Sequence, residues 1–215
     1  DRGLDPHSDT YSPGYFDIDL DDCGSAQISA SIQTPMEPEK LQPVKPSAAD
    51  FRAAEDSGIE TNMLAAMRAF VVKRGELKTV IAGYPWFLDW GRDTLIAARG
   101  LIAAPEFRGD VKAILRQFAQ FAEHGTIPNI IHGSTVGNRD TSDAQLWLFT
   151  AAEDLCKAEQ STEFLRTEIK DGKTLLDKLE EIAADIIAGT PNGIKTDPES
   201  GLVFSPPHFT WMDTN

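Results

Sequence analysis

Residues 94–121, TLIAARGLIAAPEFRGDVKAILRQFAQF, decide the fold class, because they hold two helical patterns joined through a proline. Residues 94–104 are rich in Ala, Leu and Ile and nearly apolar all round, which is typical of a helix buried on most sides. The following pattern repeats every three to four residues and closes at His124 and Gly125. Its apolar stripe consists of Val111, Ile114, Leu115, Phe118 and Phe121.

Three further segments carry the same helical period, at residues 63–71, 143–158 and 173–188. In the first of them Thr61 is a candidate N-cap, and the pattern ends before Gly75. The sequence therefore predicts about five or six helices and a mainly α fold. The apolar stripes of the three segments are Met63, Leu64, Met67, Phe70 and Val71, then Leu148, Ala151, Ala152 and Leu155, then Leu175, Leu179, Ile182 and Ile186.

The first fifty residues differ in pattern from the rest of the chain. Residues 15–20 (YFDIDL) and 26–32 (AQISASI) alternate in the manner of half-buried strands. Residues 34–50 contain four prolines and no apolar period, which indicates a linker. We therefore expect residues 1–50 to be the tail of a β-rich N-terminal domain with its linker, and residues 51–215 to form a helical domain.

Charge narrows the classes of partner. The formal net charge of −14 and the pI near 4.6 argue against nucleic acid and anionic membranes, which both need a basic face. No apolar run approaches the roughly 20 residues of a membrane span, and the N-terminal residues do not have the pattern of a secretory signal. Cys23 and Cys156 are expected to be reduced thiols of a cytoplasmic protein, although the sequence leaves a disulfide between them open.

Between the predicted helices lie long loops that hold most of the Trp, His and Pro residues. The first, residues 84–93 (YPWFLDWGRD), combines Trp86 and Trp90 with Arg92 and Asp93. Indole rings can form a platform for a sugar ring, while Arg and Asp supply a donor and an acceptor for its hydroxyls. The alternative is that Asp93 only caps the helix after it and that both indoles belong to the core.

Two later loops repeat this mixture. Residues 130–147 contain Arg139 and Asp143, and the alternative there is a simple helix start capped by Thr141 or Ser142. Residues 206–213 (PPHFTWMD) place a carboxyl group, Asp213, directly after a run of aromatic and apolar residues that includes Trp211. An apolar setting favours the protonated form of a carboxyl group, although Asp213 could equally be an ordinary surface residue in a turn.

Other kinds of site are excluded by their spacing. The DIDLDDCG segment starts like a calcium loop, but it has Asp22 at the glycine position and Ile28 at the position of the last carboxylate. His124 and His132 do not make a helical zinc pair, and the chain has neither a phosphate-binding glycine loop nor a G-x-S-x-G motif. We expect no metal or organic cofactor.

GYPWFLDWGRDTLIAARGL, NRDTSDAQLW and HFTWMD occur here in this order. In this they resemble the glucosidase domain of glycogen debranching enzymes, the amylo-α-1,6-glucosidase family, over residues 61–215. The resemblance implies an (α/α)6 toroid, shared with glucoamylases, of which this chain would hold the N-terminal half. It also implies a pocket at one end of the helices, with Asp213 as the general acid. The residues expected to bind the sugar are Trp86, Trp90, Arg92, Asp93, Arg139, Asp143 and Trp211.

The function implied is removal of α-1,6-linked glucose at branch points of glycogen or limit dextrin. In an inverting glycosidase an acid and a base stand about 6.5–9.5 Å apart. The base has no candidate at a matching position, so the 215 residues alone are expected to be inactive. Two alternatives are another α-glucosidase of this fold, similar to glucoamylase or trehalase, and a non-catalytic glucan-binding module.

Overall fold

The computed structural model describes residues 15, 17–19, 58–84, 87–132 and 135–212, and divides the chain into two units, Asp1–Ala49 and Asp50–Asn215. Residues 15 and 17–19 are not in a strand, and the expected strand at residues 26–32 and the linker lie outside the described residues. The origin of the first fifty residues stays a prediction. All helices and strands of the described residues belong to the second unit.

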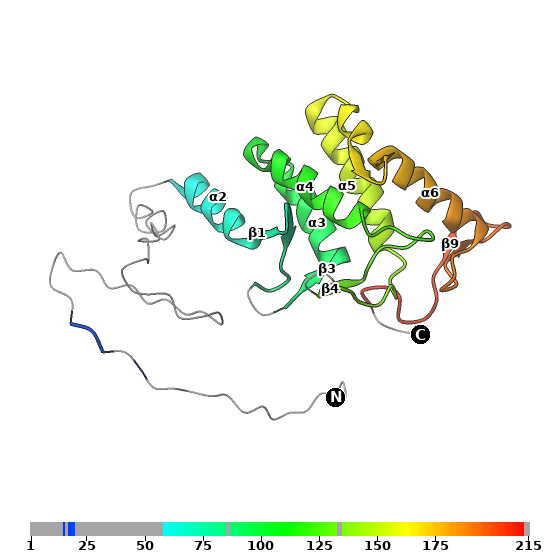
Figure 1. The fold of residues 1–215 in the computed structure, drawn as a ribbon, viewed down its shortest axis with the longest axis horizontal. Coiled ribbons are helices and arrows are strands. Elements are labelled where there is room, and N and C mark those ends of the chain that lie inside the picture. The colour runs from blue at the N-terminus through cyan, green and yellow to red at the C-terminus, as the bar shows by residue number, and fades with distance from the viewer. Residues whose placement is uncertain (1–14, 16, 20–57, 85–86, 133–134, 213–215) are drawn as a thin grey trace. The chain divides into compact units, whose positions relative to one another are not determined.

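Five α-helices dominate the described part of the second unit (Figure 1). They are α2 (Ile59–Phe70), α3 (Gly91–Leu101), α4 (Arg108–Ala119), α5 (Ala144–Glu159) and α6 (Leu175–Ala188), with the short 3-10 helices η3 (Pro105–Phe107) and η4 (Glu163–Arg166). The strands are all short: β1 (Val71–Arg74), β2 (Leu77–Val80), β3 (Asp89–Trp90), β4 (Ile130–His132), β5 (Thr135–Val136), β6 (Glu168–Lys170), β7 (Lys173–Thr174), β8 (Lys195–Thr196) and β9 (Val203–Phe204). The mainly α fold is confirmed, and its closure into a toroid stays a prediction. No helix of the described part has the length and apolar character that crossing a membrane would require.

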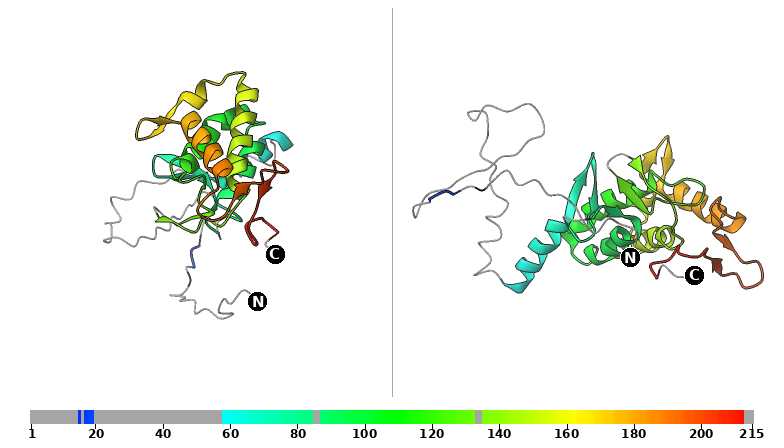
Figure 2. Two further views of the ribbon diagram at one scale, coloured as in Figure 1. Left: turned by 90° about the vertical axis from the view of Figure 1, so that its right-hand side faces the viewer. Right: turned by 90° about the horizontal axis from the view of Figure 1, so that it is seen from below.

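The core lies between α3, α4, α5 and α6. Helix α3 packs against α4 and α5, and α6 packs against α4 and η4. Two further views show the green, yellow and orange helices grouped together (Figure 2). The predicted stripes of α4, α5 and α6 are confirmed as core, apart from Phe121, which follows α4 and is only partly buried. The α3 prediction was too broad, because Ile96 and Gly100 lie on an exposed face. Helix α2 exists where a helix was expected, but it ends at Phe70, before Val71 of the predicted stripe, and none of its residues is buried.

Two predicted helix starts are wrong by a few residues. Helix α2 begins at Ile59 after Gly58, so Thr61 is inside the first turn. Helix α3 begins at Gly91, and its N-cap residue is Trp90. Asp93 is therefore not the cap, and its negative charge in the first turn instead lies near the positive end of the helix dipole.

Short strands connect the first and second motif loops, which are residues 84–93 and 130–147. β3 pairs antiparallel with β4, and β4 with β5, so the first and second motif loops share one small sheet. In this sheet Asp89 lies opposite Ile131, and Trp90 lies opposite Ile130. The pairing fixes the start of α3 relative to the segment that leads into α5.

Gly91 is the point of closest backbone approach at the start of α3. Its N–H donates to the carbonyl of Asn129 at 2.9 Å, and a Cβ at this position would lie 2.5 Å from the carbonyl oxygen of Pro128. Because backbone oxygen cannot move as a side chain can, only glycine fits here without a shift of either segment.

We expect Gly91→Ala to lower the free energy of unfolding by about 2–3 kcal/mol, because the added methyl group forces α3 and the 128–129 segment apart. Gly100→Ala in the same helix is the matched control, since a Cβ there meets nothing within 4 Å. It should be neutral or stabilising by about 0.5 kcal/mol through helix propensity. Urea unfolding followed by circular dichroism measures both. Equal stability of the two variants would show that the close approach at Gly91 is not a real constraint.

Candidate active site

The first turns of α3 and α5 lie side by side and form one hollow of about 490 Å³. It is lined by Arg92, Asp93, Ile96 and Ala97 of α3, by Asp143 and Trp147 at the start of α5, and by Trp211 of the last loop. Residues that are three or four apart on a helix share a face. This explains why residues one turn apart on α3, and Asp143 and Trp147 at the start of α5, line the same hollow. Four residues expected from the sequence to bind sugar, Arg92, Asp93, Asp143 and Trp211, are thus brought together.

An ion pair forms one side of the hollow. The Nε of Arg92 donates to both carboxylate oxygens of Asp143, at 2.9 and 2.7 Å, and the two side chains are 17% and 24% exposed. The buried hydroxyl of Thr141 donates to the same carboxylate at 3.1 Å and accepts from the backbone N–H of Ala144 at 3.4 Å. Asp143 is therefore held in one orientation from two sides.

The last loop is attached to the same helix start. The carbonyl oxygen of Phe209 accepts from Nη2 of Arg92 at 3.4 Å and from the backbone N–H of Ser142 at 2.9 Å. The hydroxyl of Ser142 also lies 2.7 Å from that of Ser205. These bonds bring Trp211 to the rim of the hollow, where its side chain is 73% exposed.

Asp93 is the available acceptor of the hollow. Its side chain is exposed, and it makes no hydrogen bond or ion pair with any described residue. A carboxylate of this kind can accept two or more hydrogen bonds from a ligand that carries hydroxyl groups. Together with the guanidinium of Arg92 and two indoles, the hollow is suited to a neutral, hydroxyl-bearing ring.

Arg139 does not line this hollow, contrary to the expectation from the sequence. Its guanidinium donates to the carbonyls of Thr126 and Phe121, at 3.0 and 2.9 Å, and pairs with Glu123 at 3.4 Å. Burial lowers the pKa of Arg139, and the nearby negative charge of Glu123, which raises it, offsets this only in part. The long side chain holds the turn at residues 121–126, ahead of its own loop, and lines a separate hollow of about 170 Å³. The hollow at the starts of α3 and α5 therefore gives no support to a sugar-binding role for Arg139, which stays a prediction.

Three other expected residues are not placed at the hollow. Trp90 is half-buried in β3 and does not line it. Trp86 and the expected acid Asp213 lie outside the described residues. Asp213 follows Trp211 by two positions in the chain, so its role stays a prediction.

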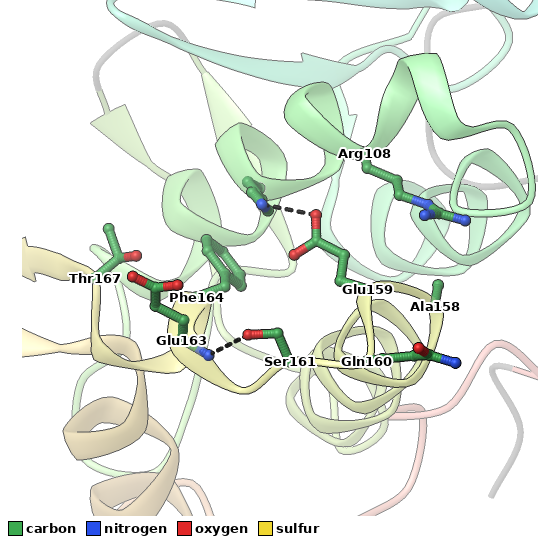
Figure 3. A pocket seen from close by; sticks show the side chains of 9 residues that line it. Arg108, Ala158, Glu159, Gln160, Ser161, Glu163, Phe164 and Thr167 are labelled. Atoms are coloured by element: carbon green, nitrogen blue, oxygen red, sulfur yellow. Dashed lines mark hydrogen bonds and ion pairs between the residues drawn. The ribbon is translucent and has the colours of Figure 1, made fainter.

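A second hollow, of about 590 Å³, lies where α4 begins and α5 ends (Figure 3). Two of its charged groups already neutralise each other, since Lys112 pairs with Glu159 at 2.7 Å. Its one aromatic ring, Phe164, is only 7% exposed and has the Lys112 ammonium 5.8 Å from its centroid. A sugar ring would find no open aromatic face there, so the hollow at the starts of α3 and α5 is the better candidate.

Trp147, Ile96 and Ala97 are pocket residues that the sequence interpretation did not assign. A signal for Trp147 was present, because it stands four residues after Asp143 in a helical pattern and so shares its face. In the described part of the chain, no group of three or more His, Cys, Asp or Glu residues is placed to hold a metal ion.

A hollow that gathers Trp, Arg and Asp side chains has the chemistry that suits a carbohydrate ligand. The pattern that defines the amylo-alpha-1,6-glucosidase family matches residues 65–215, which is more than half of the chain and includes every residue of the hollow. The chain therefore belongs to this family. Comparison with solved structures gave no match.

Proposed function

We propose that the hollow at the starts of α3 and α5 binds the terminal glucose of an α-1,6 branch of glycogen or a related α-glucan. The observation that carries this proposal is the meeting of Arg92, Asp93, Asp143 and Trp211 from three separate motifs. These motifs lie inside the segment that matches the family. The α-1,6 linkage and the toroid are carried over from the family resemblance.

Each residue has a role that follows from its contacts. Asp143 holds the Arg92 guanidinium, which presents N–H donors to sugar oxygens. The carboxylate of Asp93, which has no partner among the described residues, accepts from sugar hydroxyls, and the exposed indole of Trp211 covers an apolar ring face. Because the Arg92 charge is already neutralised by Asp143, a neutral sugar fits this site better than an anion.

The proposed chemistry is hydrolysis with inversion. Asp213 protonates the glycosidic oxygen, and a second carboxylate, which we expect from outside the 215 residues, activates the attacking water. The two groups would stand about 6.5–9.5 Å apart to leave space for that water. Neither step requires a metal or an organic cofactor.

Binding and turnover of isomaltose, which has an α-1,6 link, and maltose, which has an α-1,4 link, test the proposal. We expect the chain to bind isomaltose in calorimetry, to bind maltose more weakly, and to release no glucose from either sugar. Asp93→Ala should weaken isomaltose binding about 10- to 100-fold, because it removes the free acceptor.

Asp140→Ala is the matched control. This exposed carboxylate of the second motif loop lines the separate hollow of about 170 Å³ that Arg139 also lines. It should bind isomaltose as the unchanged chain does. Stronger binding of maltose would favour a glucoamylase-like specificity. No binding of either sugar would contradict the proposed site. Rapid release of glucose by the chain would contradict the proposal that the catalytic base comes from outside these 215 residues.

A further inference from the structure

Trp147 occupies a fixed position next to the proposed sugar site. It lies one turn after Asp143 on α5, and its backbone N–H donates to the Asp143 carbonyl at 2.9 Å. Side chains of a helix lean toward its N-terminus, so the indole covers the turn that carries Asp143. The side chain is half-buried and lines the hollow.

A cation from the neighbouring helix lies over this indole. The guanidinium carbon of Arg99, on α3, is 5.3 Å from the centroid of the Trp147 ring. The Nε of Arg99 donates to Asp154 of α5 at 2.6 Å. Asp154 is two turns beyond Trp147 on the same helix, so the three side chains form a bridge from α5 to α3 and back.

This bridge gives Trp147 a property that Trp211 lacks. One face of the Trp147 ring is covered by Arg99, and the position of Arg99 is set in turn by Asp154. The Trp211 side chain is largely exposed, and no cation is found over its ring among the described residues. A ring that is already oriented loses less conformational freedom when a ligand binds.

We propose that Trp147 is a sugar-contacting wall of the pocket and that Arg99, held by Asp154, is a positioning residue that orients its indole. The inference rests on the proposed function, because it assigns the ligand-facing ring of that same site. The aromatic surface for the sugar would then have two parts, the oriented indole of Trp147 and the exposed indole of Trp211 at the rim.

Isomaltose titration of the 215-residue chain and its variants tests the assignment. We expect Trp147→Ala to weaken binding about 10- to 100-fold and Trp147→Phe, which keeps an aromatic ring, to weaken it less. Arg99→Gln should weaken binding about 3- to 10-fold when Trp147 is present. It should have no further effect in a chain that already carries Trp147→Ala, because Arg99 acts through the ring.

The contact between Arg99 and the Trp147 ring can also be measured without a sugar. The chain has four Trp residues, so the indole N–H resonance of Trp147 can be assigned by its loss in Trp147→Phe. Arg99→Gln should shift that resonance, and Arg99→Lys, which keeps the charge, should restore part of the isomaltose affinity. Lys157→Gln, at an exposed cation of α5 that pairs with Glu153, should change neither measurement.

The outcomes separate the two proposals. Isomaltose binding that is unchanged in a folded Trp147→Ala chain would overturn the inference and leave the proposed function standing. If Trp147→Ala does not fold, Trp147→Phe and Arg99→Gln decide, and unchanged affinity in both overturns it. An equal effect of Arg99→Gln with and without the Trp147 ring would overturn the positioning role. A chain that binds no isomaltose at all contradicts the proposed site and this inference together.

Discussion

Asp89→Asn should lower the free energy of unfolding by about 3 kcal/mol, because it removes a buried carboxylate that pairs with a partly buried arginine. Asp89 is fully buried in β3 and accepts from Nε of Arg74 at 2.8 Å and also from Nη2 of the same guanidinium. Arg74 is only 22% exposed, so water cannot fully replace the lost carboxylate. The amide of Asn keeps the shape of Asp but removes its charge, which isolates the electrostatic contribution.

Urea unfolding followed by far-ultraviolet circular dichroism gives the change in free energy. Glu153→Gln is the control, since its pair with Lys157 is exposed on both sides and should leave stability unchanged. A stability of Asp89→Asn within error of the unchanged chain would mean that the Arg74–Asp89 pair contributes nothing to holding β3. Because Asp89 directly precedes the N-cap of α3, we also expect the variant to weaken isomaltose binding at Arg92 and Asp93.

Periodic apolar residues made the helices predictable. The stripe from Val111 to Phe118 and the stripes of α5 and α6 follow the 3.6-residue period, and their members are buried in the core. The hairpin of β1 and β2 was missed, because its strands have four residues each and follow a helical pattern without a break. Its turn contains Gly75 with a φ of +57°, which the sequence interpretation took only as a helix end.

The meeting of candidate residues at one hollow was predictable where a side chain stays close to its own backbone position. Arg92, Asp93 and Asp143 sit at or near helix starts, so their motifs fix where they lie. Arg139 does not line the hollow, because its long side chain bonds the carbonyls of Thr126 and Phe121, which lie earlier in the chain. Trp147 was given no binding role from the sequence, although the predicted helix at residues 143–158 already places it one turn after Asp143.

The strand pairs around the site had no sequence signal that could have revealed them. β3 and β5 have two residues each, which is too short for an alternating pattern. Their pairing with β4 depends on where α3 and α5 place their starts, and that is a consequence of core packing. The proximity of the first and second motif loops therefore follows from the fold and was supplied to the sequence interpretation by the family resemblance alone.

In a protein of this family that carries both carboxylates, Asp213→Asn should lower kcat/KM for isomaltose by about 10²- to 10⁴-fold, because general acid assistance is lost. The glucose leaving group of isomaltose is a poor one and needs a proton at the glycosidic oxygen. Fluoride leaves without a proton, so α-glucosyl fluoride should be hydrolysed by the variant at nearly the unchanged rate.

Loss of both activities would identify Asp213 as the base or as a folding residue, and loss of neither would contradict a catalytic role. Asp197→Asn is the matched control, since this half-buried carboxylate accepts hydrogen bonds from Ser200 in the turn between β8 and β9, and it should leave both activities intact. Release of glucose and of fluoride, measured across pH, completes the test, because removal of the acid should also abolish the alkaline limb of the isomaltose profile.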